Sequence, residues 1–484
     1  MKKQYGLKTN LIYSISYEIF RIIIPLITTP YVSRILGSEG VGTYTLAHTY
    51  AEYFVLFAGF GFCTYASREL AYIRDDDDDR FRSIFWEIFL ARGILLSLAT
   101  IIYFLYFFII NVSKDISYRL CLIYLIASLF DVSYYYRATE NFKTITLRNI
   151  FIKTLSLVLV FLLVKRSTDV WLYTLILAAS EAFGQVIMIG SLDKNLFKKT
   201  SIQIKDLKRH FIVSFTLFIP TIAIQVYTML DKVMLGVIST ESQVGYYENA
   251  QKIPRLSASV ASAIVGVATP RMAYIYAKND HKTLTDYFNR IFSFVSFLVF
   301  PMCFGLIGIS ESFSSWFFGA NFKGIDELVR IGAVLIISLG WSSVFGNLIL
   351  IATGNQKYYT IAVYISALIN ILMNAILISR WGAKGALLAS VMSEIIGMII
   401  MFISSNRLFK LGDVLKSIPK YFFASISMIF PIKIIERIIG LNMVSTVIQL
   451  IVAGGTYVVV MIIIKDVNMK TCLQYFKNII GRKF

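Results

Sequence analysis

The sequence predicts an all-α membrane protein with about fourteen transmembrane helices. Apolar stretches of about 20 residues recur from one end of the chain to the other, and each can cross a hydrocarbon core about 30 Å thick. The composition agrees, because 57% of the 484 residues are hydrophobic and only 16% are charged. So few charges would not cover the surface of a soluble protein of this size. The short alternating segments of a β-barrel are missing from the sequence.

The expected spans follow one another with short connections, so little of the chain is left for a soluble catalytic domain. In chain order they cover about 10–34, 43–67, 84–109, 117–137, 145–164, 170–192, 210–237, 247–276, 289–310, 326–352, 358–379, 383–405, 417–436 and 443–464. The stretches 117–137 and 417–436 are the least apolar, and without them the count falls to thirteen or twelve. Tyr134–Tyr136 and Trp316–Phe318 are predicted to form interfacial aromatic belts.

Basic residues set the expected orientation, because Lys and Arg concentrate in cytoplasmic loops. The loop after the sixth span carries Lys194, Lys198, Lys199, Lys205, Lys208 and Arg209, and the C-terminal tail carries Lys465, Lys470, Lys477, Arg482 and Lys483. Residues 239–247, which lie in a loop of opposite parity, contain no Lys or Arg. Both termini are therefore expected to be cytoplasmic, and the tail to form an amphipathic helix on the inner leaflet. The excess of Lys and Arg in the cytoplasmic loops, with anionic lipids as their partners, accounts for the net charge of +18. The net charge therefore gives no reason to expect nucleic-acid binding.

Metal and cofactor sites are not expected. The four cysteines are scattered without a CxxC motif, and the chain has only three histidines.

A repeat divides the chain. The motif V-G-x-Y-x-x-A at Val41–Ala47 returns at Val244–Ala250, 203 residues later. The same offset carries Arg68 onto Arg271, which marks both as repeat-related residues with a gating role. Six spans separate the copies, so the repeats have the same orientation in the membrane. We therefore expect two parallel six-helix lobes, 1–209 and 210–412, followed by two extra helices and the tail in 413–484. Parallel repeats of this kind build alternating-access transporters.

Ionisable residues inside the spans are candidates for function, because an unpaired charge at membrane depth is costly. Glu18 and Arg21 share one helical face of the first span, and Lys252 and Arg255 continue a stripe that begins at Glu248 in the eighth. The basic candidates for binding cargo are Arg21, Arg92, Lys252 and Arg255, and the acidic candidates for ion coupling are Glu18, Glu52, Asp131 and Asp231. Two alternatives stay open: such pairs can neutralise each other and fix helix packing, and arginines near span ends can extend to the headgroups.

The opening segment resembles that of a known transporter family. Asn10–Tyr44, with P-L-I-T-T-P-Y-V-S-R-I-L-G at its centre, is similar to the start of polysaccharide transporter flippases, and Asp231–Ile253 is similar to the junction of their seventh and eighth spans. The resemblance implies the fold of the multidrug/oligosaccharidyl-lipid/polysaccharide (MOP) exporter superfamily, which includes the MATE multidrug transporters.

The implied activity is transport, not bond chemistry. The resemblance implies that undecaprenyl-diphosphate-linked repeat units of O-antigen, capsule or exopolysaccharide cross the bacterial cytoplasmic membrane between the two lobes. It further implies coupling to a proton or sodium ion and polysaccharide polymerase machinery as a partner. On this basis the four basic candidates are expected to bind pyrophosphate or sugar.

Three alternatives are weighed against this function. A flippase for teichoic acid repeats or lipid-linked peptidoglycan precursor is hardest to separate from it by sequence. A multidrug or cation antiporter would favour acidic cavity residues, whereas the two stripes here are mixed to basic. A membrane glycan polymerase or ligase would carry a large external loop with arginines, but the loop 311–327 is short and has Lys323 as its one cation before Glu327.

Overall fold

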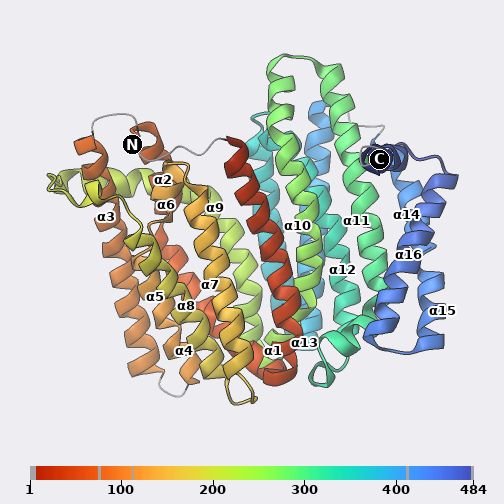
Figure 1. The fold of residues 1–484 in the computed structure, drawn as a ribbon, viewed down its shortest axis with the longest axis horizontal. Coiled ribbons are helices and arrows are strands. Elements are labelled where there is room, and N and C mark those ends of the chain that lie inside the picture. Colours follow the sequence, from red (N-terminus) through yellow and green to blue (C-terminus); the bar gives the residue numbers. More distant parts are fainter. Residues whose placement is uncertain (1–6, 75–77, 112–113, 410–413, 481–484) are drawn as a thin grey trace. The chain divides into compact units, whose positions relative to one another are not determined.

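The computed structural model describes residues 7–74, 78–111, 114–409 and 414–480 (Figure 1). Every regular element in these ranges is a helix, as the sequence predicts. The chain divides into two compact units, one of Met1–Gly236 with Thr240–Gly245 and one of Val237–Ser239 with Tyr246–Phe484. We call them unit 1 and unit 2, and each is described by itself.

Unit 1 contains the helices of the first half of the chain and the first residues of α10. Its elements are α1 (Leu7–Gly59), α2 (Phe62–Tyr72), α3 (Asp78–Phe104), η1 (Leu105–Ile110), α4 (Ile116–Leu120), α5 (Leu122–Leu129), α6 (Ser133–Ala138), α7 (Phe142–Leu163), α8 (Val170–Gly190), η2 (Lys194–Phe197) and α9 (Ile204–Ile238).

Unit 2 contains most of α10 and the helices that follow. Its elements are α10 (Glu241–Ala277), α11 (His281–Phe317), η3 (Ala320–Phe322), α12 (Ile325–Ser342), η4 (Ser343–Ile351), α13 (Gln356–Phe409), η5 (Val414–Ser417), α14 (Ile418–Ile426), α15 (Ile429–Ile439), α16 (Met443–Ile463) and α17 (Val467–Ile480).

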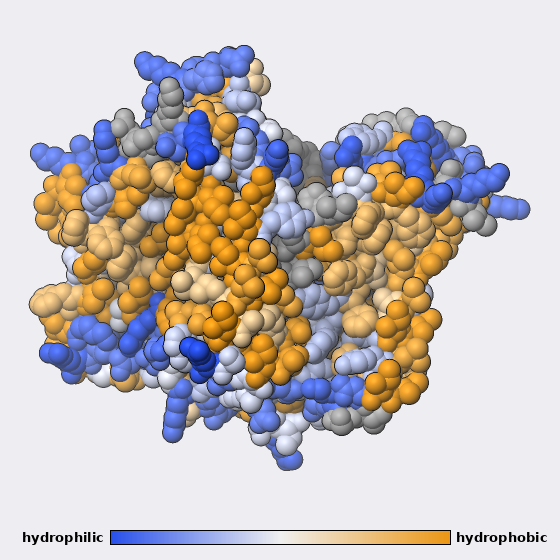
Figure 2. Space-filling view, turned by 180° about the vertical axis from the view of Figure 1, so that it is seen from behind, coloured by the Kyte–Doolittle hydropathy of each residue, from blue (hydrophilic) through white to orange (hydrophobic). Residues whose placement is uncertain are grey.

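The described residues include nine helices that are long and apolar enough to cross a membrane. Two of them, in α1 and α13, run from one expected span into the next through a kink, because Gly37 and Gly382 adopt non-helical conformations with positive φ inside these helices. Figure 2 shows apolar residues in orange over the middle of the surface and hydrophilic residues in blue toward its upper and lower ends. The protein is therefore an all-α, multi-pass membrane protein, while the count of fourteen crossings stays a prediction.

Three expected spans are broken where the sequence predicts continuous helices. The span 43–67 is divided between α1 and α2, the span 117–137 among α4, α5 and α6, and the span 417–436 between α14 and α15. The break after α5 lies at Phe130–Val132, where the Asp131 carboxylate accepts a hydrogen bond from the backbone N–H of Ser133 at 2.8 Å. A polar side chain thus satisfies a backbone group that the interrupted helix leaves unpaired.

Aromatic residues form the core of unit 1 instead of an interfacial belt. Tyr134 and Tyr136 are buried with Phe62, Tyr65 and Phe85 in one cluster between α2, α3 and α6. The hydroxyl of Tyr136 donates a hydrogen bond to the Met188 carbonyl oxygen at 2.6 Å, which fixes the ring against α8. The predicted belt at Tyr134–Tyr136 is therefore wrong, because these rings pack inward.

The helix α11 is the centre of packing in unit 2. It contacts α12, α14, α15 and α16, so the two extra helices of the C-terminal region are part of this unit. Gln449 of α16 donates hydrogen bonds to the hydroxyl of Ser312 and to the carbonyl oxygen of Ile432. Trp316 donates to Thr446 at 2.9 Å, while Phe317 and Phe318 are buried, so the second predicted belt is also wrong.

The expected tail helix is present as α17, and its position on a membrane stays a prediction. Asp466, which is buried, accepts hydrogen bonds from the backbone N–H groups of Asn468 and Met469 and so caps the first turn. The expected division into 1–209, 210–412 and 413–484 also stays a prediction. It follows from the sequence repeat, whereas the two compact units are defined by which residues pack together, so the units do not test it. In the structure α9 packs within unit 1.

Candidate functional site

The first candidate pair lies on one face of α1, as its spacing predicts. The Arg21 guanidinium is 3.0 Å from the Glu18 carboxylate, and both side chains are 52% exposed. Tyr17 lies within electrostatic range of this pair and also of Arg148 on α7 and Glu181 on α8. Glu18 and Arg21 therefore belong to a larger charged group inside unit 1, which we call the Arg148 cluster, made of Glu18, Arg21, Arg148, Lys153, Glu181 and Gln185.

Arg148 is the buried centre of this cluster. Its guanidinium donates to the Glu181 carboxylate at 2.8 Å, to the Glu181 carbonyl oxygen at 3.3 Å and to Asn149 at 2.7 Å. Gln185 donates to the same Glu181 carboxylate at 3.0 Å. The guanidinium lies directly against Gly184, where any side chain would overlap it. Sequence reasoning missed these residues, although Glu181 and Gln185 share a helical face with Gly184 beside them.

Arg92 and Asp131 lie together but not with the Arg148 cluster. The Arg92 guanidinium is 3.6 Å from the Asp131 carboxylate and donates to the Asp131 carbonyl oxygen at 2.6 Å. Arg92 is only 4% exposed, and its guanidinium binds Asp131 in the break between α5 and α6. This geometry favours a structural role for the pair, which is the alternative that the sequence left open.

The other two acidic candidates of unit 1 occupy different environments. Glu52 lies 3.6 Å from the Nδ1 atom of His48, one turn earlier on α1, and remains partly exposed. Asp231 on α9 is 1% exposed. A fully enclosed carboxylate in a membrane protein is unusual, so Asp231 is the more distinctive of the two.

The basic stripe of α10 belongs to unit 2. Lys252 and Arg255 are both half-buried, and the Nε atom of Arg255 donates to the Gln251 side chain at 2.7 Å. Their convergence with Arg21 on a shared cavity stays a prediction. Arg68 and Arg271 are exposed, and each guanidinium lies 5.5 Å from a tyrosine ring centre, that of Tyr72 and of Tyr287 respectively.

The two copies of the repeated motif touch each other within unit 1. Gly42 lies so close to the Glu241 carbonyl oxygen that a methyl group there would overlap it, and Gly245 lies equally close to the Ser38 carbonyl oxygen. The hydroxyl groups of Ser38 and Ser242 are 2.7 Å apart. Around this crossing the Glu241 carboxylate accepts hydrogen bonds from Thr43 and from the Tyr118 hydroxyl. Small residues thus allow α1 and the start of α10 to meet backbone to backbone.

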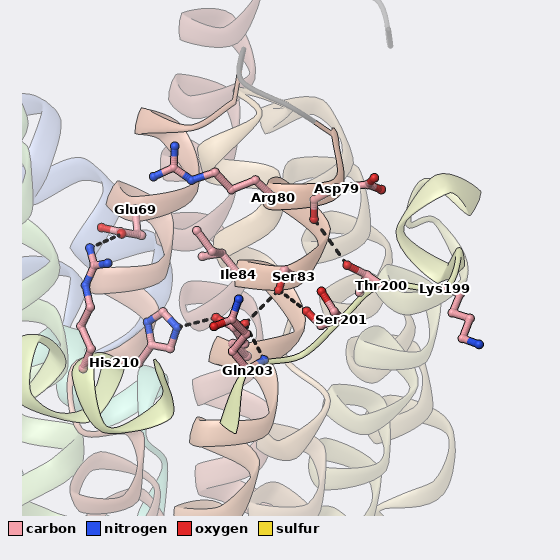
Figure 3. Close-up of a pocket in the computed structure, with 12 residues that line it drawn as sticks. Glu69, Asp79, Arg80, Ser83, Ile84, Lys199, Thr200, Ser201, Gln203 and His210 are labelled. Carbon is pink, nitrogen blue, oxygen red and sulfur yellow. Dashed lines mark hydrogen bonds and ion pairs between the residues drawn. The ribbon is translucent and has the colours of Figure 1, made fainter. Parts of the chain in front are cut away.

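A polar pocket of about 460 Å³ lies at the loop between α8 and α9 (Figure 3). Its inner wall contains Glu87 and His210, which are 3% and 2% exposed. No sequence pattern pointed to these two residues, because they are 123 positions apart and come together only through the packing of α3 against α9. Among the residues the structure describes, no group of three His, Cys, Asp or Glu is arranged to hold a metal ion.

Comparison with protein families gives two overlapping matches. The profile of the family described as "Polysaccharide biosynthesis protein" matches residues 7–276. The profile described as "Lipid II flippase MurJ" matches residues 157–468.

Individual proteins give a consistent result. The chain is 22% identical over 422 residues to the protein named "Putative O-antigen transporter" from Escherichia coli (strain K12), a match that covers 83% of this chain and 98% of that protein. Among solved structures, the lipid II flippase MurJ in an inward closed conformation is similar with a TM-score of 0.75, at 20% identity, over 94% of this chain and 98% of that one. An inward-facing MATE multidrug resistance transporter of the MOP superfamily is similar with a TM-score of 0.63, at 14% identity, over 84% and 99%. The expected superfamily fold is thereby confirmed.

Proposed function

Because this chain belongs to the polysaccharide biosynthesis protein family, a family of transporters and not of enzymes, we propose that it flips undecaprenyl-diphosphate-linked oligosaccharide repeat units across the bacterial cytoplasmic membrane. In this proposal the fourteen crossings form two parallel lobes, 1–209 and 210–412, with both termini in the cytoplasm. The diphosphate and sugars pass through a polar cavity while the polyprenyl tail stays in the bilayer, since polar groups cannot cross hydrocarbon unshielded.

One observation carries the proposal beyond family membership. The Glu18–Arg21 pair is half exposed although it lies in the middle of the first expected span. An ionised pair that faced lipid at this depth would cost several kcal/mol. The pair is therefore expected to face water, and the other basic residues of its cluster, Arg148 and Lys153, provide a cationic environment suited to an anionic diphosphate.

The test is a set of alanine substitutions at the basic candidates. Arg21→Ala, Lys252→Ala and Arg255→Ala should each reduce surface polymer and leave lipid-linked intermediates on the cytoplasmic leaflet. The loss of a charge-assisted hydrogen bond costs roughly 1.5–3 kcal/mol, which is about a tenfold to hundredfold reduction in rate. Arg166→Ala is the matched control, because Arg166 is exposed in the turn before α8. A variant that combines all three substitutions and is present at a normal protein level should make little polymer. Normal surface polymer in that variant would contradict the assignment of these residues to cargo binding.

A second candidate cargo is favoured by the match to the lipid II flippase profile over residues 157–468. Lipid-linked peptidoglycan precursor carries the same polyprenyl diphosphate, so the basic residues suit it equally well. Complementation separates the two cargoes: a strain depleted of its peptidoglycan-precursor flippase should not be rescued by this protein, whereas a strain lacking its O-antigen flippase should be.

Ion coupling is the remaining part of the proposal. A carboxylate that binds a proton or sodium ion must change its surroundings during the cycle, and the candidates are Glu18, Glu52, Asp131 and Asp231. We expect Asp231→Asn to abolish stimulation of flipping by an imposed ion gradient in proteoliposomes, because Asp231 is 1% exposed and its negative charge is costly to keep at this depth when a bound cation leaves. Asp131→Asn should instead lower stability without removing the response, since Asp131 is held by Arg92. An unchanged gradient response in all four single variants would make these carboxylates structural.

A further inference from the structure

An apolar groove of about 600 Å³ lies on the surface of unit 1, between α3 and the end of α5. These two helices pack against each other at the edge of the unit (Figure 1). One wall of the groove is a single face of α3, with Leu90, Ile94, Leu98 and Ile101, and the other wall contains Phe130. The four residues of α3 recur at helical spacing, so they form one continuous strip.

Two features of the backbone give this surface its hollow shape. Gly93 lies on the wall formed by α3, and a methyl group at that position would meet no atom within 4 Å. On the other side α5 ends at Leu129, and α6 begins only at Ser133. The groove therefore lies where one helix lacks a side chain and its neighbour is interrupted.

The groove faces the part of the membrane where hydrocarbon is expected. Its residues fall within the expected spans 84–109 and 117–137, and the side chains of Leu90, Ile94, Leu98 and Ile101 are between 41% and 56% exposed. From Leu90 to Ile101 a helix rises about 17 Å, at 1.5 Å per residue. One leaflet of the hydrocarbon core is about 15 Å thick. The groove thus has the length of one lipid chain.

A net positive charge lies at the Phe130 end of the groove. The next residue, Asp131, is paired with the buried Arg92 at 3.6 Å. A second arginine, Arg137 of α6, lies within electrostatic range of Asp131 and donates a hydrogen bond to the Ser133 hydroxyl at 3.4 Å. Arg137 is exposed, and among the described residues it forms no ion pair with a carboxylate. Two arginines and one carboxylate leave one positive charge here that is not balanced.

We propose that this groove binds an anionic phospholipid, with one acyl chain along α3 and the phosphate at Arg137. The phosphodiester of such a lipid carries a single negative charge, which matches the single unbalanced positive charge. The diphosphate of the proposed cargo carries a larger negative charge, and no residue of the groove belongs to the Arg148 cluster. A bound lipid would also cover the break between α5 and α6 on its membrane side.

Lipid binding is measured directly on the full-length protein, purified in detergent and titrated with phosphatidylglycerol or phosphatidylcholine. Native mass spectrometry counts the bound lipids and gives their dissociation constants. We expect one phosphatidylglycerol to bind about tenfold more tightly than phosphatidylcholine, because the choline group offsets the charge of its phosphate and weakens the pairing with Arg137.

A substitution at each end of the site separates the two parts of the lipid. Arg137→Gln should weaken phosphatidylglycerol about tenfold and remove the preference between the two lipids, since a charge-assisted hydrogen bond is lost. Arg166→Gln is the control, because Arg166 is exposed and lies outside the groove.

The matching substitution in the apolar part is Gly93→Leu. It should weaken both lipids about tenfold, because the new side chain takes the place of about two methylene groups of the bound chain. Leucine favours a helix more than glycine does, so the fold should be retained. Gly190→Leu in α8 is the matched control, since that position is also open.

Three results would overturn the proposal. The first is an unchanged affinity for phosphatidylglycerol in Arg137→Gln or in Gly93→Leu. The second is a dimer without bound lipid that disappears in Gly93→Leu, which would assign the groove to a second copy of the chain. The third is displacement of phosphatidylglycerol by lower concentrations of farnesyl diphosphate, which would assign the groove to the cargo.

The outcome does not depend on the flippase proposal, because the binding of phosphatidylglycerol is measured without cargo or an ion gradient. Absence of lipid binding would leave the cargo assignment intact, and a failed complementation experiment would leave the phospholipid site intact.

Discussion

At the scale of single residues, Arg148 shows how a cation is kept inside a membrane protein. Its guanidinium is surrounded by acceptors on α7 and α8, and the missing side chain of Gly184 gives it room. These acceptors replace hydrogen bonds that the guanidinium would otherwise make to water. The same arrangement fixes the carboxylate of Glu181 near the Glu18–Arg21 pair.

This geometry predicts a specific cost for filling the space at position 184. Gly184→Ala should lower the free energy of unfolding by about 1–3 kcal/mol, because the added methyl group overlaps the Arg148 guanidinium and one of the two must move. Thermal unfolding of the purified protein measures the change. Gly190→Ala on the same helix is the control, since a methyl group there meets no atom within 4 Å. Equal stability of the two variants would show that the Arg148 guanidinium can move aside without lowering the free energy of unfolding.

At the scale of elements, the close crossing of α1 and α10 is the most restrictive contact of unit 1. It leaves no space between two backbones, and it is flanked by a hydrogen bond between Ser38 and Ser242 and by one that Tyr118 donates to Glu241. Helix pairs in membranes gain much of their stability from this kind of packing between small residues. The motif that marks the repeat in the sequence is therefore also a packing motif.

We expect Gly42→Ala to be among the most destabilising single substitutions in unit 1. The methyl group would overlap a backbone carbonyl oxygen, which cannot rotate away as a side chain can, so the cost should be about 3 kcal/mol or more. Unfolding in increasing denaturing detergent is the measurement. Gly266→Ala within α10 is the matched control, because that position is open. If both variants unfold at the same detergent concentration, the backbones of α1 and α10 are far enough apart to accept a methyl group at position 42.

At the scale of the whole molecule, the pattern of basic residues predicts one orientation in the membrane. Residues 194–209 and the C-terminal tail carry many Lys and Arg, whereas residues 239–247 carry none. The anionic surface and the potential of the cytoplasmic leaflet both favour the basic segments on that side.

Thiol labelling tests this orientation. Cys472 of α17 is partly exposed, and in a variant without the other three cysteines it should react with an impermeant maleimide only when the cytoplasmic face is accessible. A cysteine introduced by Thr240→Cys, in a cysteine-free variant, should react from the opposite face. Labelling of both positions from the same side would refute the predicted topology.

The sequence was sufficient for the class of fold but not for its interruptions. Long apolar runs are a local signal, so the long helices α10, α11 and α13 and the repeated motif could be found without structural information. The break at Asp131 could not, because its partner Arg92 is 39 residues away and only packing reveals the contact. Tyr134 and Tyr136 were misassigned for the same reason: an aromatic run at a span end is equally compatible with a belt and with a core.

The candidate site divides in the same way. Spacing along one helix correctly placed Glu18 beside Arg21, since residues three apart share a face. The Arg148 cluster joins three helices and the Glu87–His210 pair joins two, and no single helix carries their pattern. Residues that act through tertiary contacts leave little periodic signal in the sequence.

The crossing of the two motif copies has the geometry of an isologous dimer interface. Gly42 meets the carbonyl of Glu241 and Gly245 meets the carbonyl of Ser38, and each of these four positions is related to its counterpart by the same 203-residue offset. In a homodimer the two chains are identical, so every substitution in such an interface appears twice, once on each side of the two-fold axis. Within one fused chain the two sides can change independently. Ser38 and Glu241 now differ, and only the second carries the carboxylate that binds Thr43 and Tyr118.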